Sequence, residues 1–211
     1  MKLSTNWINE HCKSKFTSSE LVERLTMSGV ECEIINQKSN EIIKFDITPN
    51  RADCFSVRGI TNELLAMDLI KQSKNKFQSA AVHHDRSVKI NVSSSEDCPV
   101  FATRIINNIN SNAKTPQAIR QKLEESGYKS INIIVDITNY VMLTIGQPLH
   151  AYDLDCINSP IVVRKANNKE SIELLDGSSK SLNDNFLIIA DQNKPLGIAG
   201  IMGGISSSIT D

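Results

Sequence analysis

The sequence contains no run of apolar residues long enough to cross a membrane, since a spanning helix needs about 20 in succession. Its N-terminus also lacks the apolar core and the small-residue cleavage site of a secretory signal. We therefore expect a cytosolic protein with no membrane partner.

Cysteine pairs are missing as well. No Cys-x-x-Cys motif occurs and no histidine stands at metal-ligand spacing, so the sequence predicts neither a zinc site nor a disulfide framework. We expect reduced thiols and no stoichiometric metal, which elemental analysis would check. The single cysteines are Cys12, Cys32, Cys54, Cys98 and Cys156.

A basic excess is the third absence, because 23 lysines and arginines stand against 24 acidic residues and give a net charge of −1. A domain that binds nucleic acid tightly by itself usually carries an excess of positive charge. Any RNA contact is therefore expected to be local, or shared with another polypeptide. The length of 211 residues is enough for two small domains, each with its own core.

Residues 1–70 are predicted to form a small N-terminal domain of helices and one β-hairpin. Two strands, over 30–35 and 41–48, flank a polar turn at 36–40, and a helix is expected over 54–69. An earlier helical stripe, which ends at Gly29, consists of Leu21, Val22, Leu25 and Met27. The candidate N-caps are Ser4, Ser18 and Asp53.

Residues 71–86 are rich in Lys, Gln and Ser and are predicted to be a linker, which limited proteolysis should cut first. Residues 87–211 are then expected to form a larger, mixed α+β domain. Its expected strands cover 87–92, 100–107, 161–165, 171–175 and 186–191, and its expected helices cover 116–127 and 133–145.

Polar residues in two places are candidates for function, each with a structural alternative. Asp136, Thr138 and Asn139 lie in a helix pattern that is otherwise apolar, where hydrogen bonds to the core explain them as well as a pocket does. His150 follows a proline turn at Pro148, where the imidazole can face a cleft, although a lone histidine is more often structural.

The glycine-rich segment 197–204 has backbone N–H groups that can approach an oxyanion, but tight turns or close strand packing explain its glycines equally well. It lacks the Gly-Lys-Ser/Thr ending of a P-loop, so ATP binding is not predicted. Arg51, in the segment 48–54, is expected to be solvated or paired with an aspartate rather than bound to phosphate.

The order of the motifs is more informative than any one of them. The segments TPNRADC, IIVDITNYVML, GQPLHAYD, LLDG and GIAGIMGG follow one another along the chain. In this order they closely resemble the β subunit of bacterial phenylalanyl-tRNA synthetase, over essentially the whole chain. The resemblance implies an N-terminal region and part of a B3/B4 editing domain. It also implies an α2β2 ligase in which the α subunit makes Phe-tRNA and this part of β hydrolyses Tyr wrongly attached to tRNA(Phe).

The resemblance further implies the residues of the site. Catalytic positions fall on His150 and Thr138, and substrate-binding positions on Asn139, Pro148, Gly200 and Gly203. In that setting His150 would position the aminoacyl ester or its attacking water, with no covalent intermediate. The glycines would leave room for the terminal ribose of the tRNA. The ATP and Mg²⁺ used by the complete ligase would bind outside this region, and no cofactor is expected in this chain.

The sequence departs from the family in two places. Only residues 36–40 stand where most bacterial members insert an OB domain, so the tRNA-elbow contact of that domain is not expected here. The family continues past Asp211 through a pocket glutamate, so the isolated chain is expected to hydrolyse Tyr-tRNA(Phe) feebly or not at all. The first hypothesis is a fragment of the ligase. The alternatives are a free-standing deacylase that acts in trans and a non-catalytic tRNA-binding or assembly module.

Overall fold

The computed structural model describes residues 1–37, 40–71 and 79–209, which form two compact units of mixed α and β structure. Unit 1 comprises Met1–Gln78 and Ser111–Leu149, and unit 2 comprises Ser79–Asn110 and His150–Asp211. This division differs from the expected domains of 1–70 and 87–211, because 111–149 packs with the N-terminal part. Of the expected linker, residues 72–78 lie outside the described part, and 79–86 contain no helix or strand.

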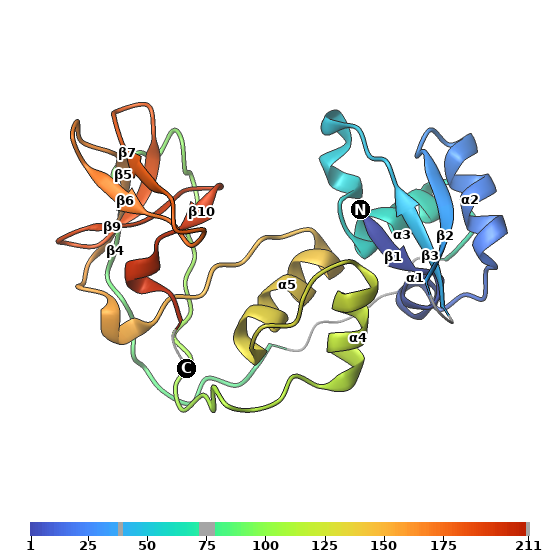
Figure 1. Ribbon diagram of the computed structural model, residues 1–211, viewed down its shortest axis with the longest axis horizontal. Helices are drawn as coiled ribbons and strands as arrows, with labels where there is room; N and C mark the ends of the chain where they lie inside the picture. The colour runs from blue at the N-terminus through green and yellow to red at the C-terminus, as the bar shows by residue number, and fades with distance from the viewer. Residues whose placement is uncertain (38–39, 72–78, 210–211) are drawn as a thin grey trace. The chain divides into compact units, whose positions relative to one another are not determined.

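Unit 1 is built on a three-stranded antiparallel sheet in the order β1-β3-β2, with helices packed against it (Figure 1). The strands are β1 (Lys2–Ser4), β2 (Cys32–Gln37) and β3 (Asn40–Phe45), and the helices of this part are α1 (Thr5–Cys12), α2 (Ser18–Met27) and α3 (Val57–Ala66). The two strands of the predicted hairpin are therefore present, each shifted by one to three residues.

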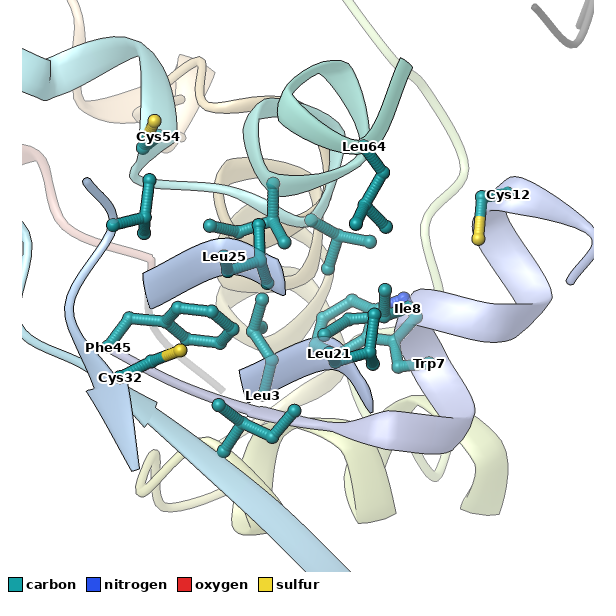
Figure 2. Packing of buried hydrophobic residues seen from close by; sticks show 14 of the residues in the cluster. Leu3, Trp7, Ile8, Cys12, Leu21, Leu25, Cys32, Phe45, Cys54 and Leu64 are labelled. Carbon is teal, nitrogen blue, oxygen red and sulfur yellow. The ribbon is translucent and has the colours of Figure 1, made fainter. Parts of the chain in front are cut away.

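Large side chains from the sheet and from the three helices fill one core (Figure 2). Leu3 and Phe45 from the strands and Ile8, Leu21 and Leu25 from the helices have no solvent exposure. Burial of apolar side chains of this size is the dominant stabilising contribution to a domain. The prediction for Met27 is wrong. It was expected in the apolar stripe of α2, but it is 83% exposed at the end of that helix.

Two of the three predicted N-caps are wrong. Thr17, not Ser18, caps α2: its Oγ1 accepts the Glu20 N–H at 3.2 Å, and the Glu20 carboxylate accepts the Thr17 N–H at 2.8 Å. Ser56, not Asp53, caps α3, because a 3-10 turn, η1 (Pro49–Cys54), delays the start of that helix. Ser4 does stand at the N-cap of α1, although its side chain makes no capping bond.

A helical hairpin, α4 (Gln117–Glu125) and α5 (Ile133–Ile145), completes unit 1. Tyr140 of α5 stacks on Trp7 with ring centroids 5.5 Å apart and planes within 4°. Lys122 of α4 lies 5.6 Å from the centre of the same indole and 2.6 Å from the Glu10 carboxylate. These contacts explain why a segment more than a hundred residues away along the chain joins the N-terminal unit.

The bounds of α5 are those predicted, because its capping signals are strong. The Asn132 side chain accepts the Val135 N–H at 3.0 Å, and Gly146 ends the helix in the left-handed conformation. Asp136 has no exposure, and its carboxylate accepts hydrogen bonds from Thr115 (2.5 Å), Ser130 (2.5 Å) and the N–H of Ile131 (3.0 Å). The structural alternative therefore accounts for Asp136.

Unit 2 contains a five-stranded sheet in the order β10-β9-β8-β5-β4, in which β4 and β5 are parallel and the other neighbours antiparallel. A separate pair, β6 and β7, lies outside this sheet. The strands are β4 (Ile90–Val92), β5 (Ile161–Lys165), β6 (Ser171–Glu173), β7 (Ser179–Ser181), β8 (Leu187–Ala190), β9 (Pro195–Ile198) and β10 (Met202–Gly203), with 3-10 turns η2 (Leu154–Cys156) and η3 (Ile205–Ser207).

The sequence predictions for unit 2 are less accurate than those for unit 1. The strand expected over 100–107 is wrong, because no strand forms there, while β7, β9 and β10 were not predicted. The core is small and mainly aliphatic, and consists of Ala166, Ile172, Leu174, Leu182, Ile188, Ala190 and Ile198 with Phe186 and Met202 at its margin. Among the described residues of both units, no helix has the length and apolar character to cross a membrane.

Candidate functional site

The residues expected to form the site are divided between the two units. Thr138, Asn139 and Pro148 belong to unit 1, whereas His150, Gly200 and Gly203 belong to unit 2. The structure brings His150 into contact with Gly203, and this contact is the centre of the candidate site in unit 2.

The glycine-rich segment forms the hairpin of β9 and β10. Gly203 pairs opposite Gly197, and Gly200 stands in the connecting turn with a φ of +71°. A Cβ on Gly197 would lie 3.3 Å from both the Gly203 Cα and the Met202 carbonyl oxygen. Close strand packing and a tight turn, which were one of the two interpretations of this segment, are therefore present.

The His150 imidazole lies directly against Gly203. A Cβ at position 203 would fall 2.2 Å from Cε1 and 2.6 Å from Nε2 of the ring. Carbon atoms in ordinary contact stand 3.5 to 4 Å apart, at about the van der Waals minimum. Only glycine at this position leaves room for the imidazole where it stands.

Tyr152 forms a second contact with the imidazole. The two ring centroids are 4.3 Å apart with an angle of 62° between the planes, an edge-to-face arrangement. The Tyr152 hydroxyl lies 3.8 Å from the position that a Cβ on Gly197 would occupy. The cluster thus consists of His150, Tyr152, Gly197 and Gly203.

Partial burial sets the protonation of both rings at neutral pH, although the His150 residue as a whole remains exposed to solvent. Burial lowers the pKa of His150, so the imidazole is uncharged and keeps a nitrogen lone pair that can accept a proton. It also raises the pKa of Tyr152 to about 12, so the phenol stays protonated. The site therefore offers an uncharged base beside an uncharged phenol.

Thr138, Asn139 and Pro148 stand in helix α5 of unit 1 or just after it. The Thr138 hydroxyl donates to the carbonyl of Val135 at 2.8 Å, one turn earlier in α5. Its oxygen lone pairs are not used by that bond and can accept a further hydrogen bond. Pro148 is exposed in the segment that follows Gly146, where α5 ends. Asn139 lies half-buried in α5 next to Thr138.

Arg51 is paired with carboxylates, and one of them belongs to an aspartate, as one of the two predicted alternatives stated. Its guanidinium contacts Asp53 at 2.9 Å, Glu63 at 2.5 Å and the Cys54 sulfur at 3.0 Å. Asp53, Cys54 and Glu63 place potential metal-ligand atoms within 4.8 Å of one another. Arg51 supplies the positive charge of that cluster, and burial raises the pKa of the Cys54 thiol to about 11, so the cluster is an ion-pair network.

In the cluster around His150, Gly197 and Tyr152 were not identified from the sequence. Gly197 was recognised only as part of a glycine-rich segment, and Tyr152 was quoted in a motif without a role. A signal was present, because side chains two residues apart in an extended segment point to the same side. His150 and Tyr152 have that spacing, in a segment without helix or strand.

The chain is similar to known proteins of one family. A family model described as "B3/4 domain" matches residues 97–211. The "Phenylalanine--tRNA ligase beta subunit" of Aliivibrio fischeri is 45% identical over 191 residues, which are 90% of this chain and 24% of that protein. The protein of the same name from Legionella pneumophila is 42% identical over 172 residues, which are 82% of this chain and 22% of that protein.

The chain thus spans about a quarter of the length of these curated relatives. A solved structure, an N-terminal fragment of the phenylalanyl-tRNA synthetase β-subunit from Pyrococcus horikoshii, has a TM-score of 0.52 at 12% sequence identity. The match covers 100% of this chain and 64% of that one. At this identity the comparison shows a similarity of fold.

Proposed function

We propose a function from the premise that this chain belongs to the phenylalanine–tRNA ligase β-subunit family and carries its B3/4 domain. The chain forms part of the ligase, contributes to its interaction with tRNA(Phe), and takes part in the hydrolysis of Tyr wrongly joined to that tRNA. The single observation that carries the proposal is the match over 97–211, which contains every residue expected in the site.

The chemical need for such a hydrolysis follows from the two amino acids. Tyr differs from Phe by one hydroxyl, and a hydrophobic pocket rejects an isostere with an added hydroxyl by a factor of only about 10². A second, hydrolytic site that acts on the ester removes the errors that the first pocket makes.

His150 is the residue that we assign to the hydrolysis. Its uncharged imidazole can accept a proton from a water molecule that attacks the ester carbonyl, or can hold that water by a hydrogen bond. The exposed side of His150 leaves access to solvent. Gly203 and Gly200 bring no side chains to the approach of the aminoacyl ester.

The α subunit of the ligase and tRNA(Phe) are the partners that this proposal implies. A chain with a net charge of −1 has no general excess of positive charge for RNA. Its contribution to tRNA binding is therefore shared with other parts of the ligase, and its own affinity for tRNA should fall as salt is added.

The experiment is a single-turnover assay of Tyr-tRNA(Phe) and Phe-tRNA(Phe) hydrolysis by a complete ligase whose β subunit carries this chain, because the isolated chain is expected to act feebly or not at all. We expect Tyr-tRNA(Phe) to be hydrolysed faster, and His150→Ala to lower that rate by roughly 10² or more, the usual contribution of general acid–base catalysis. His83→Ala, at an exposed position of the same unit, is the matched control and should retain the rate. An equal rate for the His150→Ala variant would show that His150 has no such role.

The same assay separates the alternatives. Binding of tRNA without hydrolysis of either ester would favour a non-catalytic tRNA-binding module. Rapid, Tyr-selective multiple turnover by the isolated chain would favour a deacylase that acts in trans.

A further inference from the structure

The position of the His150 ring depends on packing. Among the hydrogen bonds of residues 1–37, 40–71 and 79–209, none involves the His150 imidazole. Histidines that act in proton transfer usually have one ring nitrogen bonded to a carboxylate or carbonyl, which fixes the orientation of the ring. Some other contact must fix it here.

Two neighbours contact the imidazole, and only one of them can select its orientation. Gly203 lies against the Cε1 and Nε2 atoms of the imidazole, and the ring of Tyr152 meets the imidazole edge to face, with centroids 4.3 Å apart. An aromatic pair of this geometry stabilises one relative orientation of the two rings beyond their burial. Glycine has no side chain, so it limits how far the imidazole can approach but does not select an orientation.

We propose that Tyr152 is a positioning residue for His150: the face and edge of its aromatic ring, and not its hydroxyl, hold the imidazole against Gly203. The relevance of that orientation to hydrolysis rests on the proposed function, whereas the orientation itself does not. The hydroxyl lies toward Gly197, which offers no side-chain partner. Removing the hydroxyl should therefore have little effect, and removing the ring should have a large one.

Two substitutions at position 152 distinguish the ring from the hydroxyl. Tyr152→Phe keeps the ring, and Tyr152→Leu keeps an apolar side chain without it. The readout is the NMR signal of the His150 Cε1–H, assigned by its loss in His150→Gln, and followed through a pH titration. This signal reports the ring current of residue 152 and the pKa of the imidazole, and it does not require activity.

We expect Tyr152→Phe to retain both the chemical shift and the lowered pKa of His150. In Tyr152→Leu the ring-current shift should be lost and the pKa should rise toward the ordinary value of about 6.5, because a released imidazole is more hydrated. An unchanged shift and pKa in Tyr152→Leu would overturn the inference. So would a Tyr152→Phe variant that behaves like Tyr152→Leu, because the hydroxyl would then be the group that acts.

Gly203→Ala supplies a second test if Tyr152→Leu fails to fold. The added methyl group would stand 2.2 Å from Cε1, so it must displace the imidazole from Tyr152 while the phenol ring remains. The same rise in the pKa of His150 is expected, and an unchanged His150 signal in folded Gly203→Ala would contradict the packing described here.

The deacylation assay separates failure of this inference from failure of the proposed function. If Tyr152→Leu releases His150 but the complete ligase that carries the wild-type chain hydrolyses neither ester, the positioning role stands and the proposed function fails. If the wild-type chain is active and Tyr152→Leu changes neither the NMR signal nor the rate, the proposed function stands and the positioning role fails.

Discussion

Units 1 and 2 hold their backbones in place by different means. Unit 1 has a core of large side chains that includes Trp7 and Phe45, and its helices begin at capping residues. Unit 2 has a small aliphatic core, and its turns are held by carboxylate and amide side chains that accept backbone N–H groups.

These turn bonds follow one pattern in unit 2. The side chains of Asp153, Asp176, Asn183 and Asp191 each accept the N–H of the residue two positions later, at distances of 2.7 to 3.0 Å. Such bonds fix a turn locally and need no core. Unit 1 should therefore be most sensitive to the loss of apolar volume, and unit 2 to the loss of single polar groups.

The largest effect is expected for Phe45→Ala in unit 1. The Phe45 ring has no exposure, and its removal should lower the free energy of unfolding by about 3–5 kcal/mol. Urea unfolding followed by the emission of Trp7, the single tryptophan, reports unit 1 directly. Phe55→Ala is the control, since Phe55 is 44% exposed and its loss should cost far less. Similar losses for the two variants would contradict the role of this core.

The next effect is expected for Asp191→Ala in unit 2. The buried Asp191 carboxylate accepts the N–H groups of Asn158, Asn193 and Lys194, and its loss leaves these donors without that acceptor. We expect a loss of about 3 kcal/mol and faster hydrogen exchange at Asn193 and Lys194. The exposed Asp184, altered to Ala, is the control, and unchanged exchange in Asp191→Ala would refute the prediction.

Acid should weaken unit 1 through Asp136. Burial alone would raise the pKa of this carboxyl, but hydrogen bonds from Ser130, Thr115 and the Ile131 N–H together lower it below its ordinary value. A carboxyl with a lower pKa in the folded chain stabilises the fold fully above its unfolded pKa of about 4, and this contribution is lost as the pH falls through the folded pKa.

The variant Asp136→Asn isolates this contribution. The free energy of unfolding should differ most between wild type and variant at neutral pH, and the difference should shrink in acid, as urea titrations over a pH series would measure. A difference that does not change with pH would show that the charge of Asp136 is not involved.

The smallest effect is expected for Thr17→Ala, which removes the side-chain half of the cap on α2. The expected loss is about 1 kcal/mol, the usual contribution of an N-cap side chain. Ser18→Ala is a comparison with a different cause, because Ser18 does not cap the helix and its buried hydroxyl bonds to Thr5 and Glu41 instead. Thermal unfolding compares the two variants, and the cap assignment predicts that the Glu20 N–H loses its side-chain acceptor only in Thr17→Ala.

The parts of the fold that could be predicted from the sequence are those with local signals. Helix α5 has Asn132 before it and Gly146 after it, and its bounds were predicted correctly. Strand β5 was also predicted correctly, because five apolar and basic residues follow a proline. By contrast, β7 consists of two serines and a lysine and β10 of Met202 and Gly203, and the strand conformation of such short segments depends on a partner strand.

Contacts that are distant along the chain could not be predicted. Nothing near Tyr140 indicates that it stacks on Trp7, and this contact places 111–149 in unit 1. For the candidate site, the motifs identified His150 and the glycines, whereas the contact of the imidazole with both Gly203 and Tyr152 required the fold.

The pairing of β2 with β3 has a consequence for how this family can acquire or lose a domain. Gln37 and Asn40 are paired across the two strands, so the chain leaves and re-enters the sheet at neighbouring points. Residues paired in antiparallel strands stand only about 5 Å apart. A folded domain whose own termini lie close together can be joined at these two points without changing β1, β2 or β3, because insertion is tolerated where few contacts are broken. An insert joined at Gln37 and Asn40 would therefore leave the pairing of β1, β2 and β3 as it is.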